Sequence, residues 1–76
     1  MGRCIRFFRK DNEEFVGKIL INIDLNILLK KYNNIDYDPM LIYSYMINPE
    51  DEDFYSQYLN NFKFDFSNLD YFLDYS

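Results

Sequence analysis

Four consecutive carboxylates at residues 50–53 (Glu-Asp-Glu-Asp) are the side chains in this sequence best suited to chemistry. Such a cluster could hold Ca²⁺ or Mg²⁺, or could act as a paired general acid and base. Consecutive helical residues point in different directions, however, and the run lacks the alternating oxygen ligands and the glycine of a calcium loop. Asn48 and Pro49 come immediately before it and are typical of a helix start, where the helix dipole favours acids. The pattern therefore predicts a solvated helix N-terminus and no metal site.

A second pair of carboxylates, Asp36 and Asp38, lies among aromatic residues and could line a cleft. No reaction class follows from this pair, because the chain has no histidine to act as a general base or a metal ligand. Gly2 and Gly17 are the only glycines, which excludes a phosphate-binding P-loop and a dinucleotide-binding fingerprint. No candidate for an activated nucleophile is present either. We therefore predict that the chain is not an enzyme and binds no cofactor.

The first ten residues combine basic and aromatic side chains, as strands that bind nucleic acid often do. The residues concerned are Arg3, Arg6, Arg9 and Lys10 with Phe7 and Phe8. The four charges fall on both faces of a strand, however, and the chain has a net charge of −5, the wrong sign for binding a polyanion. We therefore predict no binding of nucleic acid.

The composition predicts a single small domain that spans residues 1–76. Sixteen residues are Phe or Tyr, which supplies enough apolar area for a packed core without a metal or a disulfide. Cys4 is the only cysteine, so we expect a buried small side chain and a reducing compartment. No apolar run approaches the roughly 18 residues of a membrane span, and the start lacks the apolar region of a signal peptide. We expect a cytoplasmic protein that does not enter a membrane.

Charge and tyrosine are divided unevenly along the chain. Residues 1–31 carry seven basic and four acidic side chains, whereas residues 32–76 carry one basic and nine acidic side chains together with all eight tyrosines. One explanation is that acids keep a small domain soluble and that a biased gene composition enriches Tyr and Asp together. The other is functional, because tyrosine is enriched at interface hot spots and a negative field steers a basic protein partner. The candidate partner-binding residues are then Asp36, Tyr37, Asp38, Tyr43, Tyr45, Asp70, Tyr71, Asp74 and Tyr75.

The elements that must position these residues begin with a β-hairpin. Residues 3–9 and 14–23 both alternate with the period of a strand, and a polar turn separates them. Asp24 is a typical N-cap, and apolar residues recur at helical spacing over residues 25–32, so a short helix should follow and end at Asn33 and Asn34.

The second part of the chain predicts further strands and one more helix. After an irregular turn at Asp38-Pro39, residues 41–47 alternate as a third strand, which we place centrally with both faces buried. A helix should run from Pro49 to about Asn60. Residues 62–66 alternate strictly and predict a strand, and residues 70–75 predict another, for which a helix is the alternative.

The predicted order of elements is ββαβαββ, which is typical of an α+β domain. We expect a mainly antiparallel sheet of four to five strands with two helices packed on one face. The helix-free face of that sheet would then be the interaction surface.

Two parts of the chain carry a family resemblance. The first combines Ile5-Arg6-Phe7-Phe8 with residues 14–19 (Glu-Phe-Val-Gly-Lys-Ile), Asp38-Pro39-Met40 and Tyr43, and the second is the ending Leu69-Asp70-Tyr71-Phe72-Leu73-Asp74. Together they resemble a family of short, acidic, uncharacterised bacterial proteins, some of which look like immunity proteins of polymorphic or contact-delivered toxins. The resemblance covers most of the chain and carries over no functional residue.

The resemblance implies a cytoplasmic domain that neutralises a toxin by covering its basic or catalytic surface with carboxylates and tyrosines. Such a domain should hold its toxin through a compact interface centred on aromatic anchors. One alternative is an acidic inhibitor or nucleic-acid mimic of a defence nuclease, which should compete with DNA and lose affinity steeply with salt. Another is a small regulatory or structural subunit that uses a sheet edge. The sequence leaves the oligomeric state open.

Overall fold

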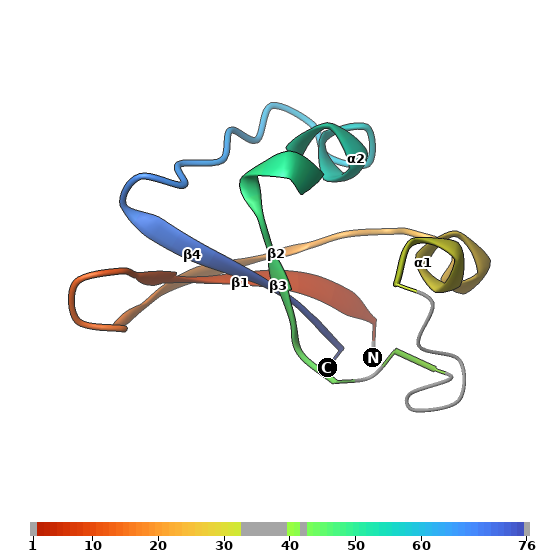
Figure 1. The fold of residues 1–76 in the computed structure, drawn as a ribbon, viewed down its shortest axis with the longest axis horizontal. Helices are drawn as coiled ribbons and strands as arrows, with labels where there is room; N and C mark the ends of the chain where they lie inside the picture. Colours follow the sequence, from red (N-terminus) through yellow and green to blue (C-terminus); the bar gives the residue numbers. More distant parts are fainter. Residues whose placement is uncertain (1, 33–39, 42, 76) are drawn as a thin grey trace.

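A four-stranded antiparallel sheet and two helices make up the described part of the fold (Figure 1). The computed structural model describes residues 2–32, 40–41 and 43–75. Its elements are β1 (Arg3–Arg9), β2 (Phe15–Leu20), α1 (Leu25–Tyr32), β3 (Tyr45–Ile47), the short 3-10 helix η1 (Pro49–Asp51), α2 (Glu52–Ser56) and β4 (Leu69–Tyr75). The strands lie in the order β2-β1-β4-β3. The predicted α+β class is confirmed at this level.

The predicted hairpin is confirmed as β1 and β2, which pair antiparallel. The backbone N–H of Arg9 donates to the carbonyl oxygen of Glu14 at 2.9 Å and closes the turn. The regular ladder of β2 ends at Leu20, before the predicted end at residue 23. The N–H of Ile21 still donates to the carbonyl oxygen of Arg3 at 3.1 Å, so the chain stays beside β1 until it turns into α1.

Gly17 on β2 lies directly opposite Phe7 on β1, and the Phe7 ring occupies the space above it. A Cβ atom at residue 17 would lie 3.0 Å from the Cζ of Phe7. The ring is held from its other side, since its centre lies 5.8 Å from that of Phe62 and 5.4 Å from that of Tyr71. The absence of a side chain at Gly17 therefore makes room for a ring of the core.

Replacing Gly17 with valine is expected to lower the free energy of unfolding by about 1–3 kcal/mol, because the branched side chain must displace the Phe7 ring. Urea denaturation followed by circular dichroism measures the change. Gly2→Val is the matched control, since nothing lies within 4 Å of a Cβ at that position. Equal stabilities of the two variants would contradict the packing role of Gly17.

The helices begin where the sequence predicts. The backbone N–H of Asn26 donates to Oδ1 of Asp24 at 3.2 Å, which confirms Asp24 as the N-cap of α1. At the start of η1 and α2, the backbone N–H of Asn48 donates to Oδ2 of Asp51 at 3.0 Å. The predicted end of α1 at Asn33 and Asn34 lies outside the described residues.

The second helix is shorter than its prediction to about Asn60, because α2 ends at Ser56. The N–H of Tyr58 donates to the carbonyl oxygen of Tyr55 at 3.0 Å, so the chain tightens there into i→i+3 bonds. Asn61 then adopts a left-handed conformation with φ of 56°, which ends the helical path.

The third strand is also shorter than predicted and lies elsewhere in the sheet. β3 has three residues, Tyr45–Ile47, and lies at an edge beside β4. The prediction of a long central strand from Leu41 is therefore wrong. Leu41 has a φ of 49°, which an extended strand cannot contain. β4 takes the central place beside β1, and the predicted C-terminal strand is confirmed, extended by one residue to Leu69.

No strand forms at residues 62–66, so that prediction is wrong as well. The alternation nevertheless describes burial correctly, because Phe62, Phe64 and Phe66 are partly buried while Lys63 and Asp65 are exposed. The three rings pack on Tyr71, with centre-to-centre distances of 6.0, 4.8 and 5.3 Å. The backbone N–H of Asp65 donates to the Tyr71 hydroxyl at 2.8 Å instead of to a neighbouring strand.

The core lies between one face of the sheet and the two helices. Its buried residues are Ile5, Ile21, Ile23, Leu28, Leu41, Ile47, Tyr55, Tyr71 and Leu73. Leu28 comes from α1 and Tyr55 from α2, so both helices contribute to the same cluster. Cys4 points to the other face and is also fully buried without a disulfide, as expected for a small buried side chain.

A polar contact joins the two helices beside this core. Lys31 Nζ lies 2.7 Å from Oδ1 of Asp51 and 4.8 Å from the ring centre of Phe54. Next to it, the hydroxyl groups of Tyr32 and Tyr55 are hydrogen-bonded to each other. Burial raises the pKa of Tyr55, and hydrogen bonding and repulsion from nearby groups raise it further.

Candidate functional site

The basic and acidic parts of the chain lie side by side in the fold. β4, from the acidic part, pairs with β1, from the basic part, along its whole length. Lys10 Nζ lies 2.7 Å from Oδ1 of Asp70, and Arg6 Nε lies 3.7 Å from Oδ2 of Asp74. Two acids of the acidic part are therefore paired with bases of the basic part at these two strands.

The predicted partner-binding acids are found in two situations. Asp36 and Asp38, with Tyr37 between them, lie outside the described residues. Asp70 and Asp74 lie on the helix-free face of the sheet, where they are half-buried and paired with the bases of β1 and its turn.

The predicted tyrosines divide between core and surface. Tyr43 and Tyr75 are 57% and 41% exposed. Tyr45 is half-buried, with its ring centre 4.9 Å from that of Tyr32, and Tyr71 is only 1% exposed. Strand alternation directs Tyr45 and Tyr71 toward the helices. A side chain as buried as Tyr71 contacts the core, so we leave it out of the candidate surface.

The candidate surface is the side of the sheet opposite the helices, which we call the open face. It consists of Cys4, Arg6 and Phe8 on β1, Phe15, Lys18 and Leu20 on β2, Asp70, Phe72 and Asp74 on β4, and Met46 on β3. Both helices contribute to the core on the other side of the sheet. Side chains of the open face are therefore available for contact wherever they are exposed.

An apolar row crosses the open face over all four strands. Met46 pairs with Phe72, the rings of Phe72 and Phe8 have their centres 5.8 Å apart, and those of Phe8 and Phe15 lie 5.6 Å apart. Met46 and Phe15, at the two ends of the row, are 48% and 55% exposed. Phe8 and Phe72, between them, are half-buried, so the row forms an apolar patch that is most exposed at its ends, and apolar surface of this kind is typical of a contact surface.

None of these four residues was among the predicted partner-binding residues. Alternation along each strand was the available signal, because it separates Phe8 from the core residue Phe7 and Phe72 from the core residue Tyr71. The alignment of these four residues into one row depends on the register between strands, which cannot be read from the sequence of a single strand.

Charged side chains flank the row on both sides. Arg6 and Lys18 lie opposite each other on β1 and β2, with Asp74 beside Arg6. The Lys10–Asp70 pair lies on the other side of the row. An apolar centre with a polar rim of mixed charge is the usual anatomy of a protein–protein interface.

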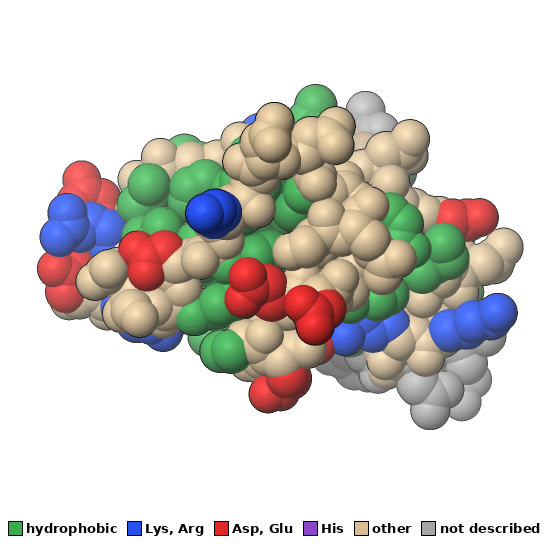
Figure 2. Space-filling view, turned by 90° about the horizontal axis from the view of Figure 1, so that it is seen from above, with side chains coloured by type: hydrophobic (Ala, Val, Ile, Leu, Met, Phe, Trp, Pro, Cys, Tyr) green, Lys and Arg blue, Asp and Glu red, His purple; other side chains and the backbone are tan. Residues whose placement is uncertain are grey.

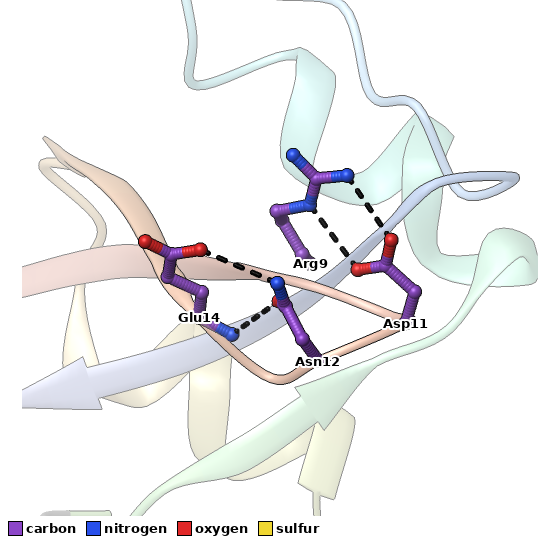
Figure 3. A network of polar contacts seen from close by, with 4 residues as sticks. All are labelled: Arg9, Asp11, Asn12 and Glu14. Atoms are coloured by element: carbon purple, nitrogen blue, oxygen red, sulfur yellow. Dashed lines mark hydrogen bonds and ion pairs between the residues drawn. The ribbon is translucent and has the colours of Figure 1, made fainter.

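The turn between β1 and β2 holds its shape through its own side chains (Figure 3). Nε and Nη2 of Arg9 donate to the two carboxylate oxygens of Asp11 at 3.1 and 3.0 Å, and this hydrogen bonding lowers the pKa of Asp11. Asn12 donates to the Glu14 carboxylate at 3.3 Å and accepts from the Glu14 N–H at 2.9 Å. Glu13 lies between them with a φ of 59°. The turn thereby places Glu13 beside Phe8 at the margin of the open face.

Exposed acids also gather on the helix side, around the start of α2. Glu50, Glu52 and Asp53 face solvent, whereas Asp51 contacts Lys31 and the cap of η1. Figure 2 looks down on this side of the molecule and shows acidic side chains set among hydrophobic ones. Three of the four consecutive carboxylates are therefore solvated, as predicted for a helix start.

The described residues contain neither a metal-type cluster nor a membrane-spanning helix. No group of three or more Cys, Asp or Glu side chains there is arranged to hold a metal ion. No helix in the same residues has the length and hydropathy needed to cross a bilayer.

Comparison with known proteins relates the chain to one family. The family model of the domain of unknown function DUF7683 matches residues 2–74. Neither a curated protein nor a solved structure gives a significant match. Because the family match covers nearly the whole fold, with three strands complete and β4 up to its last residue but one, the chain belongs to the DUF7683 family.

Proposed function

We propose that this chain is a non-catalytic protein-binding domain, that the open face of its sheet is the contact surface, and that it acts as an immunity protein. The apolar row of Met46, Phe72, Phe8 and Phe15 carries the proposal. Rings and methionine are the side chains that most often anchor protein interfaces, and here they lie in one line on a sheet face without helices.

The immunity role is supported by the sequence resemblance and by the charge of the chain. A net charge of −5 would steer a toxin that carries a basic surface and would raise its association rate. The exposed acids around the start of α2 lie on the helix side, so they would add to this steering field and not to the contact itself. A cytoplasmic location fits the single buried thiol of Cys4.

A second candidate function, a regulatory or structural subunit that binds through a sheet edge, is favoured by β2. This strand is one of the two edge strands of the sheet, and its residues Val16 and Leu20 are 48% and 77% exposed. An exposed apolar edge strand can pair with a strand of another chain. The nucleic-acid mimic has less support, because Asp70 and Asp74 are paired with bases instead of standing free like phosphates.

The proposal is tested with the protein encoded by the neighbouring gene, since an immunity protein is encoded beside its toxin. The wild-type chain is expected to bind that protein and to rescue cells that express it. The double variant Phe15→Ser/Met46→Ser is expected to bind at least about tenfold more weakly, because two anchors of about 1 kcal/mol or more are lost. Calorimetric titration measures the affinity.

Met40→Ser is the matched control, because Met40 is 57% exposed but belongs to no strand of the sheet. It should bind like the wild type. Unchanged affinity of the double variant would contradict the open face as the contact surface. Failure of the wild-type chain to bind or protect would contradict the immunity role, and displacement by a peptide strand paired with β2 would favour the sheet-edge alternative.

A further inference from the structure

We infer that a hollow at the margin of the open face binds the guanidinium group of an arginine side chain from a partner protein. The hollow measures about 240 Å³ and is lined by Phe8, Glu13, Asp70 and Phe72. Its volume would hold several water molecules, so it can accept the end of a long side chain. The inference rests on the proposed protein-binding function and names the chemistry by which the open face would recognise a basic partner.

Two aromatic residues, Phe8 and Phe72, line the hollow. Phe8 and Phe72 have their centres 5.8 Å apart with an angle of 70° between their planes, an edge-to-face pair. Both residues are half-buried, so each ring is partly accessible from the hollow. The face of an aromatic ring is negative and attracts a cation, and among cations a guanidinium stacks on it best.

Two carboxylates complete the lining and give it a negative charge. Asp70 already accepts from Lys10 through Oδ1 at 2.7 Å, and these two charges cancel. Glu13 has no ion pair with any basic side chain of the described residues, so its charge is uncompensated. One added cation would neutralise the hollow. A guanidinium suits it because its planar fork of N–H donors can meet a carboxylate while its plane lies on a ring.

The backbone conformation of Glu13 predicts that removing its carboxylate can stabilise the protein. A φ of 59° is unfavourable for glutamate and favourable for glycine. The Glu13→Gly variant should therefore be more stable than the wild type while it loses the uncompensated carboxylate. Asn61, with a φ of 56° at an exposed site outside the open face, is the matched control, and Asn61→Gly should leave arginine binding unchanged.

The test is an NMR titration of the free chain with N-acetylarginine amide, compared with the neutral isostere N-acetylcitrulline amide. We expect the backbone amide signals of Glu13, Asp70 and Phe72 to shift with the arginine compound and at least about tenfold less with the citrulline compound. In Glu13→Gln and Asp70→Asn the apparent affinity should fall several-fold, with unchanged spectra elsewhere as evidence of an intact fold. Equal responses to both compounds, or an unchanged response in both variants, would overturn the inference.

This titration separates the inference from the proposed function, because it needs no partner. If the arginine compound does not bind but the Phe15→Ser/Met46→Ser variant still loses its partner, only the arginine site is refuted. Arginine binding that succeeds while no neighbouring gene product binds would leave the site and refute the immunity role.

Discussion

Replacing Tyr71 with alanine is expected to remove about 3–5 kcal/mol from the free energy of unfolding, the largest effect of any single substitution that we predict. Tyr71 is 1% exposed, and its ring packs against those of Phe7, Phe62, Phe64 and Phe66. Alanine would leave a cavity between β4 and the segment that covers it. A chain of this length has a total stability of roughly 5–10 kcal/mol, so the variant should be largely unfolded well below the melting temperature of the wild type.

The Tyr71→Phe variant distinguishes the contribution of the ring to stability from that of the hydroxyl group. It keeps the aromatic packing but leaves the backbone N–H of Asp65 without its acceptor, which should cost about 1–2 kcal/mol. Tyr75→Ala, on the same strand but 41% exposed, should cost much less. Urea denaturation followed by near-ultraviolet circular dichroism ranks the three variants. A Tyr71→Ala variant as stable as Tyr75→Ala would contradict the assignment of Tyr71 to the core.

Raising the pH above about 10 is expected to unfold the protein, because three tyrosines are held in their neutral form by the fold. Burial is the main cause that raises the pKa of Tyr32, Tyr55 and Tyr71. In the unfolded chain each tyrosine ionises near its ordinary pKa of about 10, whereas in the fold each keeps its proton to higher pH. The stabilisation is therefore complete below about pH 10 and is lost as the pH rises, by about 1.4 kcal/mol per pH unit for each such tyrosine.

The Tyr55→Phe variant tests this origin of the alkaline unfolding. At neutral pH it should be less stable than the wild type by about 1–3 kcal/mol, because the part-buried hydroxyl of Tyr32 loses its partner. Above about pH 10 the difference in free energy of unfolding between Tyr55→Phe and the wild type should become smaller, because the variant has one fewer tyrosine that can lose its proton. The control is Tyr75→Phe, which changes an exposed residue and should follow the wild-type curve. Urea midpoints between about pH 8 and pH 12 measure both curves, and parallel curves for Tyr55→Phe and the wild type would contradict the explanation.

Signals that act within a few residues explain the elements that were predicted well. Strand alternation placed β1 at residues 3–9 and predicted the hairpin, and the Asp24 and Asn48-Pro49 signals marked the two helix starts. Alternation also separated the buried rings from the exposed charges at residues 62–66, although that segment is not a strand. Burial and strand pairing are different properties, and a period of two reports only the first.

The candidate surface was predicted less well, because exposure was judged from residue type. Tyrosine is common at interfaces, yet Tyr71 fills the core and Tyr45 packs on Tyr32. The phenylalanines Phe8 and Phe15 would ordinarily be assigned to a core, yet they lie on the open face. Which side of the sheet the helices cover decides between these outcomes, and no single segment contains that information.

The amino-acid sequence by itself determined the N-terminal hairpin, the two helix starts, the α+β class and the net negative charge, because capping, periodicity and composition act along the chain. The tertiary structure decided which strands are neighbours. It placed β4 beside β1, which cancels the charge of Asp70 and Asp74 against Lys10 and Arg6 and aligns one apolar row over four strands. Lys10 and Asp70 are 60 residues apart in sequence. Contacts over such separations form only when the whole sheet assembles and its register is set by burial of one face, so they are properties of the complete fold.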